Sequence, residues 1–235
     1  MCGRFTLTTD PGVVGRRFGA PPAQGGASTP RGAPRYNIAP TQTVVTVTEG
    51  GARQLEEMRW GLVPRWAKDP KVGAKMINAR AETLAEKPAF RDALRRRRAI
   101  IPADGFYEWA AGAPGSRSKQ PMHVRLKSGE PFGFAGLWDE WKPPEGGAPL
   151  RTCTIITTEP NELMATFHHR MPVILAPDAE GMWLDPEITD PGMLLSLLVP
   201  YPAEVMEAFP VGQGVNAVAN DSPQLVLPLD LPGPA

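Results

Sequence analysis

Apolar and polar residues alternate along much of this chain, and a period of two is typical of half-buried strands. The alternation is clearest where β-branched residues gather, as in TVVTVT at 43–48 and TCTIITT at 152–158. We predict strands within residues 4–10, 43–48, 53–60, 99–109 and 119–141, joined by glycine-containing turns. Residues 150–175 are predicted as a strand, a short helix and a further extended segment.

Helical spacing is confined to short stretches. We predict a short helix in residues 11–20 and the best helical region in residues 78–98, where Pro88 divides it. Three more short helices are expected in residues 178–186, 191–199 and 202–209. Segments rich in glycine and proline predict surface loops at 19–34, 113–119 and 142–149, and residues 225–235 predict an extended tail.

The order of these elements bears on the fold class. Strands outnumber helices and do not alternate with them regularly, which favours an α+β fold over a doubly wound one. We expect a strand-rich core with a mixed sheet that can close into a barrel, and short peripheral helices. Neither an internal repeat nor a linker is visible, so residues 1–235 are predicted to form a single domain.

Composition and charge narrow the function classes. The hydrophobic fraction of 42% is that of an ordinary soluble core. Lys and Arg together number 25, as do Asp and Glu, so a polyanion would need a local basic patch. The sequence contains neither a signal-peptide pattern nor an apolar run of roughly 18 residues. We therefore expect a cytoplasmic protein without a membrane partner. We also expect a monomer.

The standard cofactor and metal motifs are missing from the sequence. It contains no G-x-x-x-x-G-K-[ST], G-x-G-x-x-G, H-E-x-x-H or C-x-x-C, so neither a cofactor nor a metal is expected. The neighbours His168 and His169 would point to opposite faces of a strand, which makes them a poor chelating pair. Asp139 and Glu140 would diverge in the same way and are predicted to be turn or surface residues.

The two cysteines call for different interpretations. Cys153 lies in a β-branched run and is predicted to be a small buried hydrophobe. Cys2 lies near a terminus, which is a poor place to bury a side chain. If Met1 is removed, Cys2 carries an amine and a thiol on adjacent carbons, both partly nucleophilic near neutral pH. Such a pair converts an aldehyde first to a Schiff base and then to a thiazolidine ring.

Four polar positions could assist this chemistry. Glu108 stands between aromatic residues, where desolvation would raise its pKa toward the range of a general acid or base. Asn78 follows an apolar pair, His168 precedes a buried-looking run, and Asn37 precedes a rigid X-Pro segment. Each also has an ordinary interpretation, as a capping Asn, a surface Glu or a core His. The arginine run at 95–98 is either a DNA contact or a solvated helix end whose cations suit the helix dipole.

Eight segments together resemble one family. They are MCGRF, RYNIAPTQ, WGLVPRWA, INARAET, RAIIPADGFYEW, FAGLWDEW, TCTIITT and HHRMPVIL. In this order they resemble the SRAP proteins, the SOS-response-associated peptidase family. The match covers residues 2–175 and is looser over 176–235.

The resemblance implies a strand-rich α+β domain that recognises abasic sites in single-stranded DNA as part of the DNA damage response. It implies a thiazolidine crosslink, a strand-cleaving lyase step and self-removal of Met1, in a protein that is nucleoid-associated when bound to DNA. The catalytic positions it implies are Cys2 as nucleophile, Asn78 as the amide that holds the terminus and sugar, Glu108 as proton shuttle and His168 as the aid to ring opening. The DNA-binding positions are Arg4, Asn37, Pro40, Arg80 and Arg170 by resemblance, with Arg65 and Trp66 added for charge and stacking.

Two departures from the family pattern stand out. His169 replaces the acidic residue expected after the catalytic histidine, which could alter the tautomer and pKa of His168. The segment PRWAKDP supplies Trp66 but not paired tryptophans, so base stacking would rely on fewer aromatic rings.

Two other functions remain open at the level of the sequence. The first is an N-terminal-nucleophile hydrolase, or a self-processing cysteine peptidase, which would also use Cys2 with its own amine as base. The second is a noncatalytic single-stranded DNA-binding module, which would bind intact and abasic strands alike and would tolerate loss of Cys2.

Overall fold

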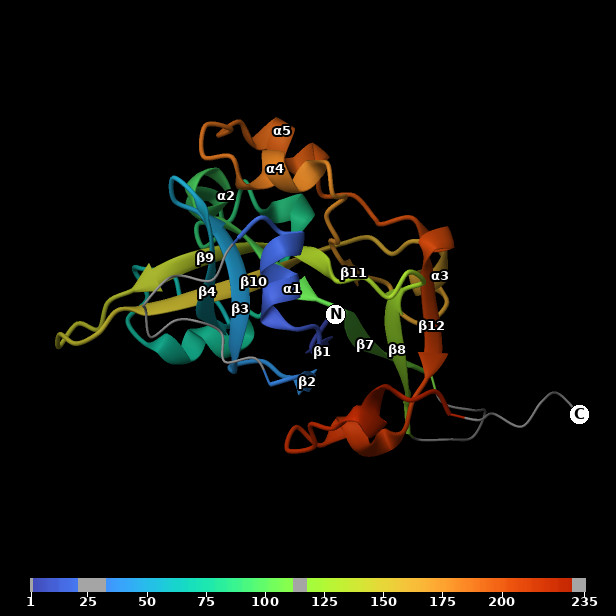
Figure 1. Ribbon diagram of the computed structural model, residues 1–235. Coiled ribbons are helices and arrows are strands. Elements are labelled where there is room, and N and C mark those ends of the chain that lie inside the picture. The colour runs from blue at the N-terminus through green and yellow to red at the C-terminus, as the bar shows by residue number, and fades with distance from the viewer. Residues whose placement is uncertain (1, 21–32, 112–117, 230–235) are drawn as a thin grey trace, which may run out of the picture.

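The computed structural model describes residues 2–20, 33–111 and 118–229 (Figure 1). Most of the predicted loops at 19–34 and 113–119, and the end of the predicted tail at 225–235, lie outside the described residues. The strands are β1 (Phe5–Leu7), β2 (Arg35–Ile38), β3 (Thr43–Glu49), β4 (Arg53–Trp60), β5 (Asn78–Arg80), β6 (Arg98–Ala103), β7 (Gly105–Ala110), β8 (Gln120–Leu126), β9 (Phe132–Trp141), β10 (Leu150–Thr158), β11 (Met171–Pro172) and β12 (Met206–Pro210).

The helices are short. The α-helices are α1 (Pro11–Arg17), α2 (Arg91–Arg96), α3 (Glu162–Ala165), α4 (Ala179–Leu184) and α5 (Pro191–Ser196). The 3₁₀ turns are η1 (Pro70–Lys75), η2 (Ala81–Thr83), η3 (Ala203–Val205), η4 (Gln213–Asn216) and η5 (Pro223–Val226). No helix in the described parts of the chain is long and apolar enough to cross a bilayer.

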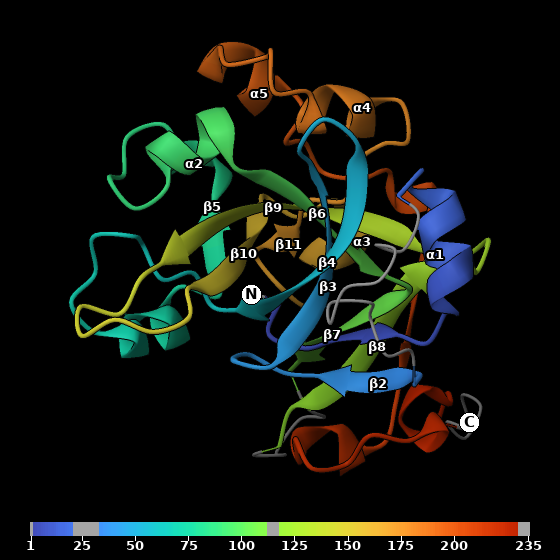
Figure 2. The same cartoon turned by 60° about the vertical axis from the view of Figure 1, so that its left-hand side comes forward.

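The strands form two sheets, one of which closes on itself. The first runs β12-β8-β7-β1-β2 with antiparallel neighbours throughout. The second runs β10-β4-β3-β6-β9, and pairing of β9 with β10 completes a five-stranded ring (Figure 2). The β4–β10 pair is parallel and the other pairs in the ring are antiparallel, so this barrel is mixed. The predicted α+β class with a mixed, barrel-like core is therefore confirmed.

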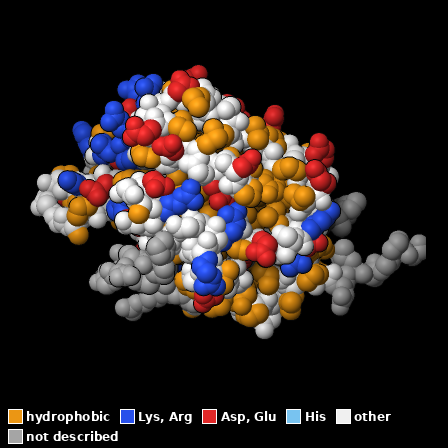
Figure 3. Space-filling view, turned by 45° about the horizontal axis from the view of Figure 1, so that its top comes forward, with side chains coloured by type: hydrophobic (Ala, Val, Ile, Leu, Met, Phe, Trp, Pro, Cys, Tyr) orange, Lys and Arg blue, Asp and Glu red, His pale blue; other side chains and the backbone are white. Residues whose placement is uncertain are grey.

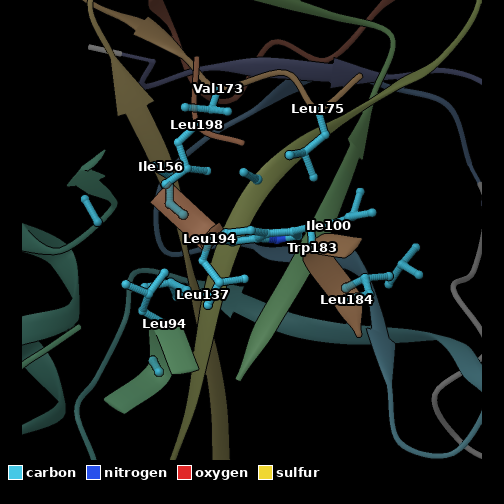
Figure 4. Packing of buried hydrophobic residues seen from close by; sticks show 14 of the residues in the cluster. Leu94, Ile100, Leu137, Ile156, Val173, Leu175, Trp183, Leu184, Leu194 and Leu198 are labelled. Carbon is cyan, nitrogen blue, oxygen red and sulfur yellow. The ribbon is translucent and has the colours of Figure 1, made fainter. Parts of the chain in front are cut away.

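One hydrophobic core lies between the barrel and the helices. Trp183 of α4 is fully buried there, and its indole nitrogen donates to the Ala99 carbonyl at 2.9 Å. Strand residues such as Ile100 and Leu137 pack with helix residues such as Leu94 in the same cluster (Figure 4). The short helices are thus held by tertiary burial rather than by their own propensity.

A second core joins the two sheets. It combines Phe5 and Phe106 of the first sheet with Trp60 and Cys153 of the barrel. Cys153 is fully buried, which confirms its prediction as a small hydrophobe. Cys2 belongs to the same cluster, so the segment that leads into β1 is inserted between the sheets.

Local signals explain where several helices begin. Asp10 precedes α1, and its carboxylate accepts from the Gly12 amide at 2.8 Å while Pro11 occupies the first turn. Asn161 precedes α3 and accepts from the Met164 amide at 2.9 Å. Both are N-caps, which satisfy amides that the helix itself leaves unpaired.

Two predicted helices are wrong. Of residues 78–98, only Arg91–Arg96 forms an α-helix, while Asn78–Arg80 forms β5 because it pairs in parallel with β10. Within 202–209, only Ala203–Val205 is helical, as a 3₁₀ turn, and β12 pairs with β8. In both cases pairing with a strand distant in sequence overrides a local preference.

Candidate active site

Cys2 lies at the junction of the two sheets. Its side chain is 0% exposed and is not in a disulfide. The thiol lies 4.0 Å from the Arg4 carbonyl, and β1 begins three residues later. The expectation that a cysteine so close to a terminus would be a poor candidate for burial is therefore wrong, because packing between the sheets encloses it.

Asn78 fixes the backbone of Cys2. Its side-chain amide donates to the Cys2 carbonyl at 2.8 Å. Asn78 reaches this position because β5 lies against β10 at the edge of the barrel. The Asn78 Oδ1 atom is buried and accepts no hydrogen bond from the described residues, so it is available to a donor in the site.

Glu108 and His168 form the polar wall of the same site. Glu108 lies on β7 and is 2% exposed, and its Oε2 is 3.8 Å from Nε2 of His168. The Arg170 backbone holds the opposite ring nitrogen, with its amide 3.0 Å and its carbonyl 2.9 Å from Nδ1. The turn after α3 therefore directs Nε2 at the carboxyl group. We name Cys2, Asn78, Glu108 and His168 the Cys2 pocket.

Burial dominates the electrostatics of the Cys2 pocket. It raises the pKa of the Cys2 thiol, and the Glu108 charge raises that pKa further. Burial also raises the pKa of Glu108, in the direction that the sequence predicted. It lowers the pKa of His168, with a smaller contribution from the neighbouring His169. Each charged form loses hydration here, so the pocket favours proton transfer between neutral groups.

The two adjacent histidines differ from the prediction. They were expected on opposite faces of a strand, but they lie in the turn between α3 and β11, and their rings stack at 4.6 Å between centroids. His169 is exposed while His168 is half-buried. Among the described residues, no group of three His, Cys, Asp or Glu side chains is arranged to hold a metal ion.

A groove opens beside His168. Its volume is about 640 Å³, and its lining includes Trp109, Lys119, Phe167, His168 and His169. It combines aromatic faces with a cationic side chain, which are the two components that single-stranded nucleic acids require of a binding surface.

Arg4 and Asn37 are committed to the C-terminal part of the chain. Asn37 is buried, and its amide donates to carbonyls of that segment, the shortest bond being 2.7 Å to Asn220. Arg4 donates to Asn37 Oδ1 and to the Val215 carbonyl, each at 2.7 Å. The expectation that the Asn37 side chain lines a DNA groove is corrected here, because that side chain is buried against the C-terminal segment. Pro40, two residues after β2, is half-buried.

The other predicted DNA-binding arginines fall into two groups. Arg170 donates to both carboxylate oxygens of Glu82, at 2.5 and 3.0 Å, and to the Thr157 carbonyl at 2.6 Å. The hydrogen bond from Arg170 lowers the pKa of Glu82. Arg80, by contrast, is exposed and has no side-chain partner among the described residues. Only Arg80 of this pair is thus free to meet a phosphate without first releasing a carboxylate.

Asp139 is a residue that the sequence interpretation misplaced. It was predicted to be a turn or surface residue, but it lies on β9 and is 3% exposed. Its Oδ2 accepts from the Arg65 amide at 3.0 Å, and its Oδ1 pairs with the Arg65 guanidinium at 3.1 Å. The alternation with Leu137 and Trp141, which are both buried, was the signal that could have placed Asp139 inside.

Asp139 thereby fixes the turn that carries Trp66. The indole of Trp141 donates to the Ala67 carbonyl at 2.6 Å, which holds the other side of the turn. Trp66 itself is 64% exposed. A large aromatic residue on a well-anchored turn is presented to solvent rather than packed away.

Comparisons with known proteins show which family this chain belongs to. The chain is 51% identical over 96% of its length to the abasic site processing protein YoqW of Bacillus subtilis, covering 99% of that protein. It is 34% identical to the abasic site processing protein HMCES of Gallus gallus, over 98% of this chain and 79% of the other. A crystal structure of a Bacteroides thetaiotaomicron protein matches with a TM-score of 0.86 and 27% identity, over 97% of this chain and 100% of that one. The model of the SOS response associated peptidase (SRAP) family matches residues 1–218, and the chain belongs to this family.

Proposed function

We propose that this protein binds single-stranded DNA and covalently traps abasic sites in the DNA damage response. Its relatives YoqW and HMCES are named as abasic site processing proteins. The observation that carries the proposal is that four segments far apart in sequence meet here. Asn78 holds the Cys2 carbonyl, Glu108 lies 3.8 Å from His168, and the Glu108 charge acts on the buried Cys2 thiol. These groups suit the capture of a sugar aldehyde.

The reaction begins after Met1 has been removed, when Cys2 carries the α-amino group. That amine adds to the aldehyde carbon of the ring-opened sugar and forms a C–N bond. Glu108, whose pKa is raised, donates a proton to the hydroxyl that leaves as water, and an iminium remains. The thiol sulfur then bonds to the same carbon and returns its proton to Glu108. One water is lost overall and a five-membered thiazolidine remains.

The other groups of the pocket have supporting roles. Asn78 fixes the Cys2 carbonyl, and its buried Oδ1 is an acceptor for the new α-amine or for a sugar hydroxyl. His168 directs Nε2 toward Glu108 and assists proton transfer during opening of the sugar ring. If the iminium is not captured, removal of the adjacent C2′ proton by Glu108 expels the 3′ phosphate. That elimination would be the lyase activity.

The strand itself is bound by charge and stacking. Arg80, the last residue of β5, is an exposed cation, and Trp66 offers an exposed ring. Arg65 precedes Trp66 and Arg170 follows His168 by two residues, while Arg4 and Pro40 complete the proposed DNA-binding set. An abasic sugar has no base to read, so such a surface would recognise the backbone and the neighbouring bases.

A peptidase is the second candidate, because the family description names one. Cysteine peptidases need a thiolate, and their surroundings lower the pKa of the thiol. Burial raises the pKa of the Cys2 thiol instead. In thiazolidine formation the amine reacts first and the thiol second, so a protonated thiol fits that order better.

The test is crosslinking to a single-stranded oligonucleotide with one abasic site, followed by denaturing electrophoresis and intact mass measurement. We expect a stable adduct whose mass lacks Met1 and one water. Cys2→Ala should abolish this adduct, while Cys153→Ala, which removes the other buried cysteine, should retain it. A stable adduct with Cys2→Ala, or an adduct that keeps Met1, would contradict the proposal.

A further inference from the structure

The fold divides the arginine run at 95–98 into two inner and two outer side chains. Arg98 is buried and donates to the carbonyls of Leu94 and Arg95 at 2.8 and 2.7 Å, so it caps the C-terminal end of α2. Arg97 forms an ion pair with Asp139 at 3.2 Å. Arg95 and Arg96 are exposed and have no side-chain partner in the described part of the chain.

Helix capping does not explain the outer arginines. The last carbonyls of α2 already receive hydrogen bonds from Arg98, so the helix end needs no further cation. Arg91, one turn earlier on α2, is exposed as well, and its ion pair with Asp92 is long, at 3.9 Å between exposed groups. Exposed pairs of this kind contribute little to stability. Three arginines thus project from one short helix without a structural task.

Asp139 connects α2 to the turn that carries Trp66. Its carboxylate binds Arg97 from the end of α2 and Arg65 from the Trp66 turn, both at Oδ1. The two guanidinium groups therefore lie side by side, although Arg65 and Arg97 are distant in sequence. Trp66 is next to this pair and is exposed.

We name the resulting region the arginine surface. It consists of five arginines around two aspartates: Arg65, Arg91, Arg95, Arg96 and Arg97 with Asp92 and Asp139. The whole chain has a formal net charge of zero, so this excess of positive charge is local. Figure 3 shows Lys and Arg side chains gathered at the upper left of the molecule, the side that carries α2 in Figure 1.

A continuous path links the arginine surface to the Cys2 pocket. Asn78 donates to the Cys2 carbonyl, and the segment just before β5 accepts from the start of the Trp66 turn, with Leu62 N to Met76 O at 3.1 Å. Direct contacts therefore connect Cys2 to β5, β5 to the Trp66 turn, and that turn to α2 through Asp139. A strand that leaves the pocket past Trp66 would next meet the arginines.

We propose that the arginine surface binds the phosphodiester backbone of the DNA strand that continues beyond the abasic nucleotide, with Trp66 at the boundary. The inference rests on the proposed function and adds a second contact region to it. Guanidinium groups pair with phosphates through two parallel hydrogen bonds, and each contact releases a condensed counterion. Exposed arginines beside an exposed aromatic ring are the combination expected of a strand-binding surface.

The test compares single-stranded oligonucleotides of about 5 and about 20 nucleotides, a span chosen from typical site sizes. Their Kd values are measured by fluorescence anisotropy with the variant R91Q/R95Q/R96Q, whose glutamines preserve helix propensity. We expect about 10-fold weaker binding of the long strand and an unchanged Kd for the short one. The slope of log Kd against log salt for the long strand should fall by about 2, as loss of three phosphate contacts implies.

The matched control is R16Q/R125Q/K127Q, which removes the same charge from exposed positions elsewhere on the molecule. It should change neither the length dependence nor the salt slope. Equal weakening at both lengths, or no weakening of the long strand, would overturn the inference. Adduct formation on the short abasic oligonucleotide tests the proposed function separately. Suppose that this adduct still depends on Cys2, but R91Q/R95Q/R96Q prefers the long strand over the short one by the same factor as wild type. Then only the role of the arginine surface is refuted, and the proposed function stands.

Discussion

The Cys2 pocket and the arginine surface place polar groups in opposite environments. In the pocket, Cys2 and Glu108 are almost fully enclosed. Burial raises the pKa of each, which favours the uncharged form. On the arginine surface, Arg95 and Arg96 are open to solvent and remain without partners in the described chain. Reactive groups gain from exclusion of water, whereas groups that attract phosphate need accessible charge. The molecule thus separates chemistry from strand binding.

Arg170 lies between these two extremes. Its side chain is largely buried, and its two terminal nitrogens are engaged by Glu82 and Thr157. The Arg170 guanidinium can bind a phosphate only if the phosphate displaces Glu82 or shares the guanidinium with it. The contrast between Arg170 and the exposed arginines shows that a sequence position matching a phosphate contact does not by itself make an available cation.

The largest effect is expected from the chemistry of the pocket. Glu108→Gln removes the proton shuttle while keeping the shape of the side chain, so single-turnover adduct formation should slow by about 100-fold or more. Binding of intact single-stranded DNA should be unchanged. Glu130→Gln, at an exposed position in the β8–β9 turn, is the control and should react at the wild-type rate. An unchanged rate with Glu108→Gln would remove this residue from the mechanism.

The next effect concerns the link between the two regions. Asp139→Ala leaves Arg97, whose side chain is only 13% exposed, without its carboxylate. The free energy of unfolding should fall by about 3 kcal/mol, as measured by urea denaturation. Asp92→Ala removes the exposed partner of Arg91 and should cost no more than about 0.5 kcal/mol. Similar losses in both variants would show that the Asp139 cluster has no special role in holding the Trp66 turn.

A smaller effect should sharpen the contrast between Arg170 and the arginine surface. Glu82→Gln removes the carboxylate that competes with phosphate for Arg170, so affinity for single-stranded DNA should rise by about 3-fold at low salt. Glu86→Gln removes an exposed charge nearby that has no ion-pair partner among the described residues, which makes it the matched control. Equal gains from both substitutions would point to general electrostatics rather than to release of Arg170.

The smallest effect is a pH-dependent gain in stability. Because burial raises the pKa of Glu108, the folded state binds its proton more tightly than the unfolded state does. The stability contributed by this proton is present below the unfolded pKa of about 4.3 and is lost as the pH rises through the folded value. Glu108→Gln should therefore have a higher Tm than wild type at neutral pH, with the difference vanishing near pH 4. Scanning calorimetry between pH 4 and neutral pH measures this Tm difference. A Tm difference that does not change with pH would contradict the argument.

Much of this protein could be predicted from its sequence, because alternation with a period of two is a local property. The strands around Val47, Phe106 and Ile155 follow from that pattern, as does the strand-rich α+β class. Part of the candidate pocket could also be predicted from the sequence, since Cys2 and Glu108 stand in unusual settings along the chain. The physical reason is that side-chain periodicity and burial preference act over a few residues.

Other features were decided only by tertiary structure. Asn78 became part of a strand because β10 offered a partner, and His168 stacks with His169 because the chain turns there instead of extending. Likewise, consecutive arginines have different roles. Arg97 pairs with Asp139 and Arg98 donates to carbonyls of α2, while the two arginines before them are exposed to solvent. Which group lies opposite a given side chain depends on contacts between segments far apart in sequence. Such contacts are properties of the folded core, and no local pattern encodes them.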